Sequence, residues 1–152
     1  MREPLLGVAV GKKGVGKTFT TNRVIKQYVM GNPASGIMPR KVLILDANDE
    51  YTEYKAIALK DLMLFSVHPL VEARRIRPIH ADGKKMTLDD LATTLNYILE
   101  VFSGGLLLIE DINRFTSDFM PQDLMGAIAT NRHRDLDIIL HYQGIGRIGT
   151  KV

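Results

Sequence analysis

The chain contains an uninterrupted match to the pattern G-x-x-x-x-G-K-[ST], the segment GKKGVGKT at residues 11–18. An apolar run at residues 5–10 precedes this segment, and a helical pattern at residues 17–30 follows it. Glycines let the backbone wrap closely around a phosphate, its N–H groups form an anion-binding nest, and the helix adds its positive N-terminal end. The pattern therefore predicts a phosphate-binding loop between a strand and a helix. A glycine-rich turn without a ligand is the alternative.

The chemistry of such a loop assigns a role to two of its residues. Lys17 would reach the β- and γ-phosphates of a nucleoside triphosphate, and Thr18 would place its hydroxyl on Mg²⁺. ATP and Mg²⁺ are therefore the expected cofactors. The residues expected to contact the nucleotide are Gly11, Lys12, Lys13, Gly14, Val15, Gly16, Lys17, Thr18 and Phe19.

Strand and helix patterns alternate along the chain, which predicts an α/β domain with a mostly parallel sheet. Further strands are expected at residues 41–45, 75–79, 106–109 and 136–140, and further helices at residues 88–102 and 121–133. Residues 56–65 are ambiguous, with a short helix as the favoured interpretation. Thr87 is expected to cap the helix that follows it. The buried face of that helix should carry Leu88, Leu91, Leu95, Ile98 and Phe102.

Composition limits the class of protein. A length of 152 residues suits one domain, and 45% hydrophobic with 24% charged residues is typical of a soluble globular protein. The chain has no cysteine, which excludes disulfides and thiolate metal sites and fits a reducing compartment. No apolar run approaches the roughly 18 residues that span a bilayer. We therefore expect a cytoplasmic protein without a membrane anchor of its own.

An acidic pair, Glu110 and Asp111, follows the most apolar strand pattern. Together with the phosphate loop, this pair resembles P-loop ATPases, in which the strand beside the phosphate loop ends in two acids. By position, Glu110 would hold Mg²⁺ through water and Asp111 would polarise the attacking water. The usual order is Asp-Glu, so the reversed order here leaves the two roles open. A strand end with solvated acids is the alternative.

Other polar residues lie at or near predicted strand ends. Gln143 would sense the γ-phosphate or orient water, unless it is a solvated strand end. Arg132 and Arg134 precede the same strand, and each is either an arginine finger or a surface residue. The acids of the segment DANDEY at residues 46–51 would help to position the metal or the water, unless this segment is only a polar turn.

The net charge of +3 is small, and its excess is concentrated in two clusters that would either meet phosphates or form solvated basic surface. One cluster contains Arg74, Arg75, Arg77, His80, Lys84 and Lys85. The other contains Arg132, His133, Arg134, Arg147 and Lys151.

Taken in order, these motifs resemble the FtsK–HerA superfamily of ring-forming, DNA-pumping ATPases, and within it the viral genome-packaging ATPases. Apart from the Walker A loop, the segment TNRHRDLDIILHYQ at residues 130–143 carries most of the likeness. The resemblance implies a three-layer P-loop NTPase fold of the ASCE (RecA-like) type, with a mostly parallel central sheet flanked by helices. It also implies that the acidic-pair strand lies beside the phosphate-loop strand.

For partners, the resemblance implies a homo-oligomeric ring (a pentamer or hexamer), double-stranded DNA in its pore, and a capsid portal. Residues 1–152 would then be an ATPase domain, alone or as the N-terminal part of a longer packaging protein, in the host cytoplasm if the protein is viral. Arg147 is a second choice for the arginine finger. The catalytic set carried onto this sequence is Lys17, Glu110, Asp111, Arg132, Arg134 and Gln143, with Thr18 and Glu110 at the metal.

These inferences predict an ATP-hydrolysing motor domain that translocates double-stranded DNA, in the packaging of a viral genome into a procapsid. Two alternatives stay open: a small P-loop kinase, and a non-packaging FtsK–HerA or Zot-like ATPase of assembly or DNA transfer. The sequence contains no Asn-Lys-x-Asp motif that would select guanine, which argues against a GTPase.

Overall fold

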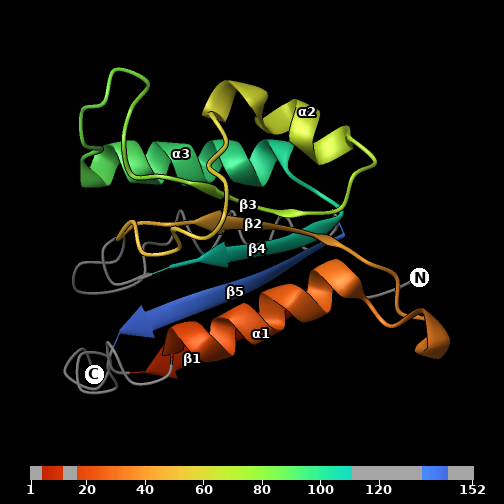
Figure 1. Ribbon diagram of the computed structural model, residues 1–152. Helices are drawn as coiled ribbons and strands as arrows, with labels where there is room; N and C mark the ends of the chain where they lie inside the picture. The colour runs from red at the N-terminus through yellow and green to blue at the C-terminus, as the bar shows by residue number, and fades with distance from the viewer. Residues whose placement is uncertain (1–4, 12–16, 111–134, 144–152) are drawn as a thin grey trace.

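The computed structural model describes residues 5–11, 17–110 and 135–143 (Figure 1). The strands of this part of the chain are β1 (Leu6–Gly11), β2 (Lys41–Leu45), β3 (Ala73–Ile76), β4 (Gly105–Ile109) and β5 (Leu136–Gln143). Its helices are α1 (Lys17–Met30), α2 (Leu62–Val67) and α3 (Leu88–Val101), with short 3₁₀ turns at Pro33–Ser35 and Leu59–Asp61.

Local sequence patterns predicted most of these elements. The bounds of α1 and β2 coincide with the predicted ones, and α3 begins directly after Thr87. The helix expected at residues 56–65 begins only at Leu62, because Ala56 forms a parallel bridge with Arg75 and its neighbours are extended beside β3. The strand expected at residues 75–79 is shifted towards the N-terminus, as β3. The helix expected at residues 121–133 lies outside the described residues.

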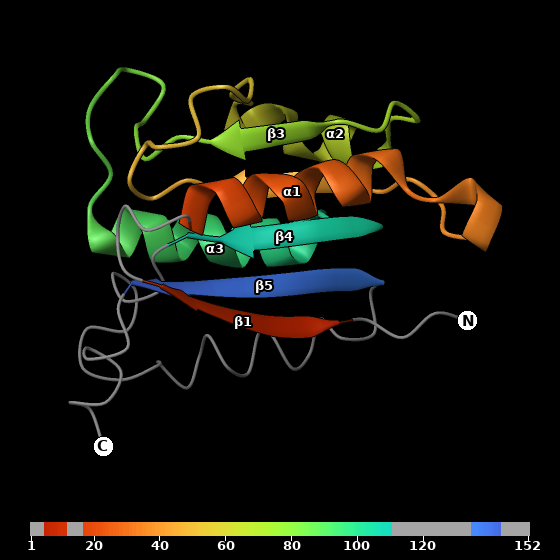
Figure 2. The ribbon, with the colours of Figure 1, turned by 60° about the horizontal axis from the view of Figure 1, so that its bottom comes forward.

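The five strands form one sheet in the order β1-β5-β4-β2-β3, and every neighbouring pair is parallel. Helix α1 covers one face of the sheet, and α2 and α3 cover the other (Figure 1). Figure 2 shows α1 in front of the sheet, with β4, β5 and β1 following one another at one side. The predicted α/β fold, with three layers and a parallel central sheet, is confirmed.

The expected place of the acidic-pair strand was wrong. We expected β4 beside β1, but β5 lies between them and pairs with both. Strand neighbours depend on pairing between distant segments, which the apolar pattern of a single strand does not encode. As a consequence, the polar residues at the end of β5 lie between the phosphate-loop strand and the acidic-pair strand.

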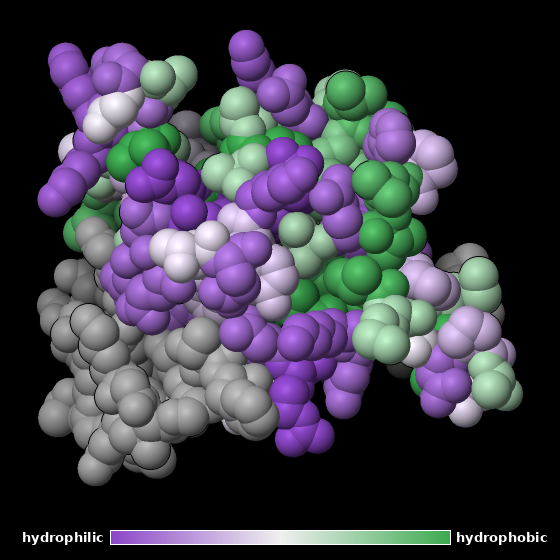
Figure 3. Space-filling model, in the orientation of Figure 1, coloured by the Kyte–Doolittle hydropathy of each residue, from purple (hydrophilic) through white to green (hydrophobic). Residues whose placement is uncertain are grey.

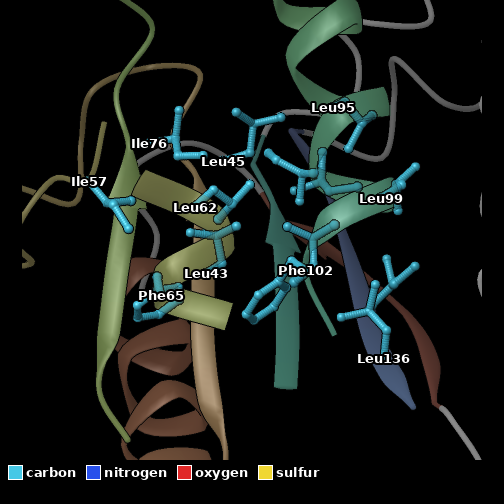
Figure 4. Packing of buried hydrophobic residues seen from close by; sticks show 14 of the residues in the cluster. Leu43, Leu45, Ile57, Leu62, Phe65, Ile76, Leu95, Leu99, Phe102 and Leu136 are labelled. Atoms are coloured by element: carbon cyan, nitrogen blue, oxygen red, sulfur yellow. The ribbon is translucent and has the colours of Figure 1, made fainter. Parts of the chain in front are cut away.

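Each face of the sheet has its own hydrophobic core, because successive side chains of a strand point to opposite faces. On one face, Leu43 and Leu45 of β2 pack in a cluster with residues of α2 and α3, including Phe65 and Phe102, whose rings stack with centroids 5.9 Å apart (Figure 4). On the other face, Ile25 of α1 packs against Val42, Ile44, Leu106 and Leu108. Both faces are buried, as expected for a parallel sheet between helices.

Helix α3 begins and ends where its sequence predicts, but one of its residues is not buried as expected. Thr87 caps the helix: its hydroxyl accepts from the Asp90 backbone N–H while the Asp90 carboxylate accepts from Thr87 N–H, forming a capping box. Gly104 follows the helix with a φ of 76°, in the left-handed region that glycine tolerates. Leu88, the first residue of α3, was expected in the core but is 51% exposed.

A buried aspartate ties α1 to β5 at the end of the sheet where the strands begin. Asp137 is fully buried, and its carboxylate accepts a hydrogen bond from Tyr28 Oη at 2.9 Å and from the Leu5 backbone N–H at 2.8 Å. These donors explain an acid within an apolar strand, since a buried charge requires partners.

The surface over this fold is mixed. Figure 3 shows hydrophobic side chains gathered at the upper right, where α2 lies in Figure 1, and a mostly hydrophilic surface at the upper left. Met63, Leu64 and Val67 of α2 are exposed. Among the described residues, no helix combines the length and apolar character that a membrane crossing requires.

Candidate nucleotide-binding site

The parallel sheet brings three of the predicted site residues to one edge. Gly11 ends β1, Gln143 ends β5, and Glu110 directly follows β4, so all three lie where strands end. In the β1–β5 register Gly11 pairs with Gln143, which places Gln143 beside the first glycine of the phosphate loop. This edge, at the carboxyl ends of the strands, is where open α/β sheets bind ligands.

Glu110 is fully buried, and its position is fixed by two side chains. The Tyr51 hydroxyl donates to Glu110 Oε2 at 2.8 Å. His141 Nδ1 lies 2.9 Å from the same oxygen, and because an ionised carboxylate only accepts, the imidazole is the donor. Glu110 is therefore a restrained carboxylate inside the protein and not a solvated strand end.

Tyr51 connects this carboxylate to α1. The tyrosine is fully buried, and burial, followed by the neighbouring Glu110 carboxylate, raises its pKa, so that its hydroxyl stays a neutral donor. Thr21 also hydrogen-bonds the Tyr51 side chain. Thr21 lies one helical turn after Thr18. The carboxylate at the end of β4 is thus linked, through two side chains, to the helix that begins at Lys17.

The loop after β2 is a polar turn built on Asp46. This fully buried carboxylate accepts from the backbone N–H groups of Glu50 at 2.9 Å and Tyr51 at 3.0 Å. Arg75 Nη1 also donates to it, at 2.8 Å. Asp46 therefore serves the structure of the loop, and one of the groups it holds in place is the backbone of Tyr51.

The first basic cluster divides into arginines that bond other groups of the protein and lysines on the surface. Arg74 donates hydrogen bonds to the backbone carbonyls of Lys55 and Ala56. Arg75 donates to the carboxylates of Asp46 and Asp49, and Arg77 forms a bidentate ion pair with Asp49. By contrast, Lys84 and Lys85 are exposed on the connection between β3 and α3. Within this connection the His80 backbone N–H donates to the Lys84 carbonyl at 2.8 Å. The three arginines are therefore engaged with other groups of the protein, although the Arg77 side chain is 39% exposed, and the two lysines lie on the surface.

Comparison with known proteins identifies the fold. No family model and no curated protein matches the chain. One similar solved structure is the genome packaging NTPase B204 of Sulfolobus turreted icosahedral virus 2 in complex with ATP-γS. The match covers 100% of this chain and 73% of the B204 chain, with 19% sequence identity and a TM-score of 0.57. The chain has the P-loop NTPase fold.

Two further structures agree. The sulfate complex of the same B204 has a TM-score of 0.57 at 17% identity, over 95% of this chain. B204 of Sulfolobus turreted icosahedral virus, described as a DNA-packaging ATPase, has a TM-score of 0.56 at 16% identity, over 96% of this chain. This chain spans 66% and 69% of their respective lengths. The resemblance to packaging ATPases is thus confirmed for the fold.

Several predicted site residues of this P-loop NTPase fold lie outside the described part of the structure. They are Lys12, Lys13, Gly14, Val15, Gly16, Asp111, Arg132, Arg134 and Arg147. For Lys17, Thr18, Phe19 and Gln143 the structure describes the backbone alone. Their backbones lie at the start of α1 and at the end of β5.

Sequence reasoning missed Thr21 and His141, and it gave Tyr51 no role of its own, although it singled out the segment at residues 46–51 that Tyr51 ends. Tyr51 and His141 are far from Glu110 in sequence, by 59 and 31 residues, so no local motif contains them. One available signal was a large aromatic residue closing the polar segment DANDEY, since a tyrosine that is buried usually bonds a partner through its hydroxyl.

The donor set of the site fits a magnesium ion bound together with a nucleotide. Within the described residues, no group of three or more His, Asp or Glu side chains is arranged to hold a metal. Mg²⁺ at a nucleotide needs only one or two carboxylates, because phosphate oxygens and waters complete its shell. Glu110 supplies such a carboxylate, at the carboxyl ends of the strands.

One prediction concerns the substitution Asp49→Asn. The backbone φ of Asp49 is 55°, a left-handed conformation that asparagine also tolerates, so the substitution should not strain the backbone. Hydrogen bonds from Arg77 and then Arg75 lower its pKa from 3.8 to about 2. A depressed carboxylate pKa stabilises the fold above pH 4, and this stabilisation is lost as the pH falls from 3.8 towards 2. Because the side chain is 36% exposed, screening reduces the effect to about 1 kcal/mol.

Asp49→Asn should therefore lower the free energy of unfolding at pH 7 by about 1 kcal/mol, with the difference from wild type vanishing near pH 2. Urea unfolding followed by circular dichroism across this pH range measures it. Glu53→Gln, an exposed change of equal charge on the same loop, is the control. An equal, pH-independent effect of the two variants would contradict the stabilising role of Asp49.

Proposed function

We propose that this chain is an ATP-hydrolysing motor domain that translocates double-stranded DNA, in the packaging of a viral genome. The observation that carries the proposal is the connection between α1 and the end of β4. Glu110 is bound to Tyr51, and Tyr51 to Thr21 of the helix that follows the phosphate loop. A carboxylate linked to the helix that follows a phosphate-binding loop supports a role in holding the magnesium ion of a bound nucleotide.

The residues of the site have the following proposed roles. The loop amides and Lys17 bind the phosphates, and Thr18 and Glu110 hold Mg²⁺, which when bound neutralises phosphate charge. Asp111 polarises the water that attacks the γ-phosphate, and Gln143, paired in register with Gly11, senses the γ-phosphate or orients that water. An arginine from a neighbouring subunit, Arg132 or Arg134, stabilises charge in the transition state.

The proposed partner is double-stranded DNA in the pore of a homo-oligomeric ring that docks on a capsid portal. Two observations support DNA. First, the fold is shared with B204, a protein described as a DNA-packaging ATPase. Second, the connection between β3 and α3, which contains Lys84 and Lys85, lies on the same side of the molecule as the carboxyl ends of the strands, at the upper left of Figure 1. An exposed basic segment there would reach a DNA backbone.

The experiment is ATPase activity measured with and without double-stranded DNA. We expect DNA to stimulate turnover, since a translocase couples hydrolysis to its track. Absence of stimulation with intact hydrolysis would contradict the motor assignment, and phosphate transfer to a small acceptor would support the kinase alternative.

The double variant Lys84→Ala/Lys85→Ala should weaken DNA binding and reduce the DNA-dependent increase in turnover. Removing two phosphate contacts should reduce the magnitude of the negative slope of log affinity against log salt concentration by about 2. Fluorescence anisotropy of labelled duplex DNA at several salt concentrations measures this slope. Lys26→Ala/Lys60→Ala removes the same charge at exposed positions on α1 and before α2. An equal loss in both double variants would mean that net charge, and not this segment, governs DNA binding.

A further inference from the structure

Glu110 receives one donor from each side of its own strand. In the sheet order, β5 and β2 flank β4. His141 belongs to β5, and Tyr51 lies in the loop that follows β2. Both donate to the same oxygen, Oε2, at 2.9 and 2.8 Å. The carboxylate is therefore clamped between its neighbouring strands, and its orientation is set by side chains that do not belong to the acidic motif.

Tyr51 is itself fixed along its whole length. Its backbone N–H donates to Asp46 Oδ2, its ring is buried in the cluster that contains Ile25 of α1, and its hydroxyl bonds Glu110. Thr21 adds a bond from α1 to the same side chain. A rigid, fully buried side chain thus spans from the helix behind the phosphate loop to the acid.

The identity of the acid explains why such a clamp is useful. A glutamate side chain has three rotatable bonds, so its carboxylate can take many positions unless hydrogen bonds restrain it. Catalytic and metal-binding groups must be held within about 0.5 Å of their working geometry by surrounding hydrogen bonds. Two donors on one oxygen restrict this freedom of the Glu110 side chain.

We propose that Tyr51 is a positioning residue of the nucleotide site, which together with His141 orients Glu110 towards the metal bound with the nucleotide. This inference rests on the proposed function, because it assumes that Glu110 serves a magnesium–nucleotide complex. Tyr51 touches neither nucleotide nor metal and acts through Glu110. Loss of its hydroxyl should affect the use of Mg²⁺ more than the binding of the nucleotide itself.

The chain offers a matched control for Tyr51→Phe. Tyr54 lies on the same loop, with its ring 6.4 Å from that of Tyr51, and its hydroxyl donates to Asn22 Oδ1 of α1 at 2.9 Å. Tyr54→Phe therefore removes one hydroxyl and one hydrogen bond to the same helix without touching Glu110. Any general effect of losing such a bond appears in both variants.

Binding of a fluorescent ATP analogue, titrated with Mg²⁺, measures the inference without turnover. For Tyr51→Phe we expect about a 10-fold higher Mg²⁺ concentration at half-maximal effect, unchanged affinity in EDTA, and a kcat lower by about 10- to 100-fold. Tyr54→Phe should match wild type in all three. Equal Mg²⁺ midpoints in the two variants, or a parallel loss in both that follows their melting temperatures, would overturn the positioning role.

A second pair of variants covers the case in which Tyr51→Phe does not fold. His141→Leu removes the other donor to Glu110, whereas His141→Asn retains an amide N–H close to the place of Nδ1. The Mg²⁺ midpoint should rise in the leucine variant and return towards wild type in the asparagine variant. Equal midpoints in both would contradict the clamp. If wild-type protein binds no magnesium–nucleotide complex at all, the proposed function itself fails, which separates the two outcomes.

Discussion

Replacing Lys17 with alanine should abolish ATP hydrolysis, with turnover falling by at least about 100-fold. The reason lies in the backbone position of this residue, the first of α1, directly after the phosphate loop. The N-terminal end of a helix carries a partial positive charge, so a lysine in the first turn is unfavourable unless an anion is present. A triphosphate at this point would be that anion.

The same argument predicts that Lys17→Ala folds normally. Removing a cation from the first turn relieves repulsion with the helix dipole, so α1 is not weakened. Turnover should therefore be lost while the melting temperature is maintained. Both can be measured on one preparation, by phosphate release and by thermal unfolding.

Lys26→Ala is the control, because it removes the same charge from an exposed position of the same helix. Its turnover should equal that of wild type. Wild-type turnover in Lys17→Ala, after a further purification step that excludes a contaminating ATPase, would refute the assignment of the phosphate loop.

Short-range signals in the sequence predicted the elements well. The helix after the phosphate loop, β2 and the capped helix α3 all depend on residues within a few positions of one another, as in the Thr87–Asp90 capping box. The order of the strands depends on pairing across the whole chain. Local patterns therefore gave no strand order, and the order that the family resemblance implied, with β4 beside β1, was wrong because β5 separates them.

The candidate site shows the same division. Glu110 stood out because an acid follows four apolar residues, which is a local pattern. Its two hydrogen-bond donors, Tyr51 and His141, did not stand out in the sequence. They reach Glu110 only because β2 and β5 lie on either side of β4 in the sheet. Neighbours in sequence can also separate in space: Arg75 turns inward to Asp46, while Lys84 is presented to solvent. A basic cluster read from the sequence therefore mixed structural and exposed charges.

The second large effect should be on stability, in Asp46→Asn. The buried carboxylate serves three donors: the Glu50 and Tyr51 backbone N–H groups and Arg75 Nη1. An asparagine of the same shape has one carbonyl oxygen, so its amide NH₂ would face at least one of these donors. Removing one partner of a buried ion pair costs about 3–5 kcal/mol, because the other charge loses its compensation.

We expect a loss near the lower end of this range, about 3 kcal/mol, because the substituted asparagine would keep one acceptor and Arg75 would keep its bond to Asp49. For a chain of this length, that loss lowers the melting temperature by about 6–12 °C. The control is Asp135→Asn, which disrupts the Arg40–Asp135 pair with its N–O distance of 3.1 Å. Asp135 is 55% exposed and its φ of 53° suits asparagine, so the cost should stay below about 1 kcal/mol.

Asp46→Asn should also impair hydrolysis under conditions where the variant is still folded, because the Tyr51 backbone loses the acceptor that holds it beside Glu110. Turnover measured well below the melting temperature separates this effect from unfolding. Equal melting temperatures for Asp46→Asn and Asp135→Asn would show that the buried turn does not stabilise the fold. Full turnover in a destabilised Asp46→Asn would show that the turn holds the loop but does not set the position of Tyr51.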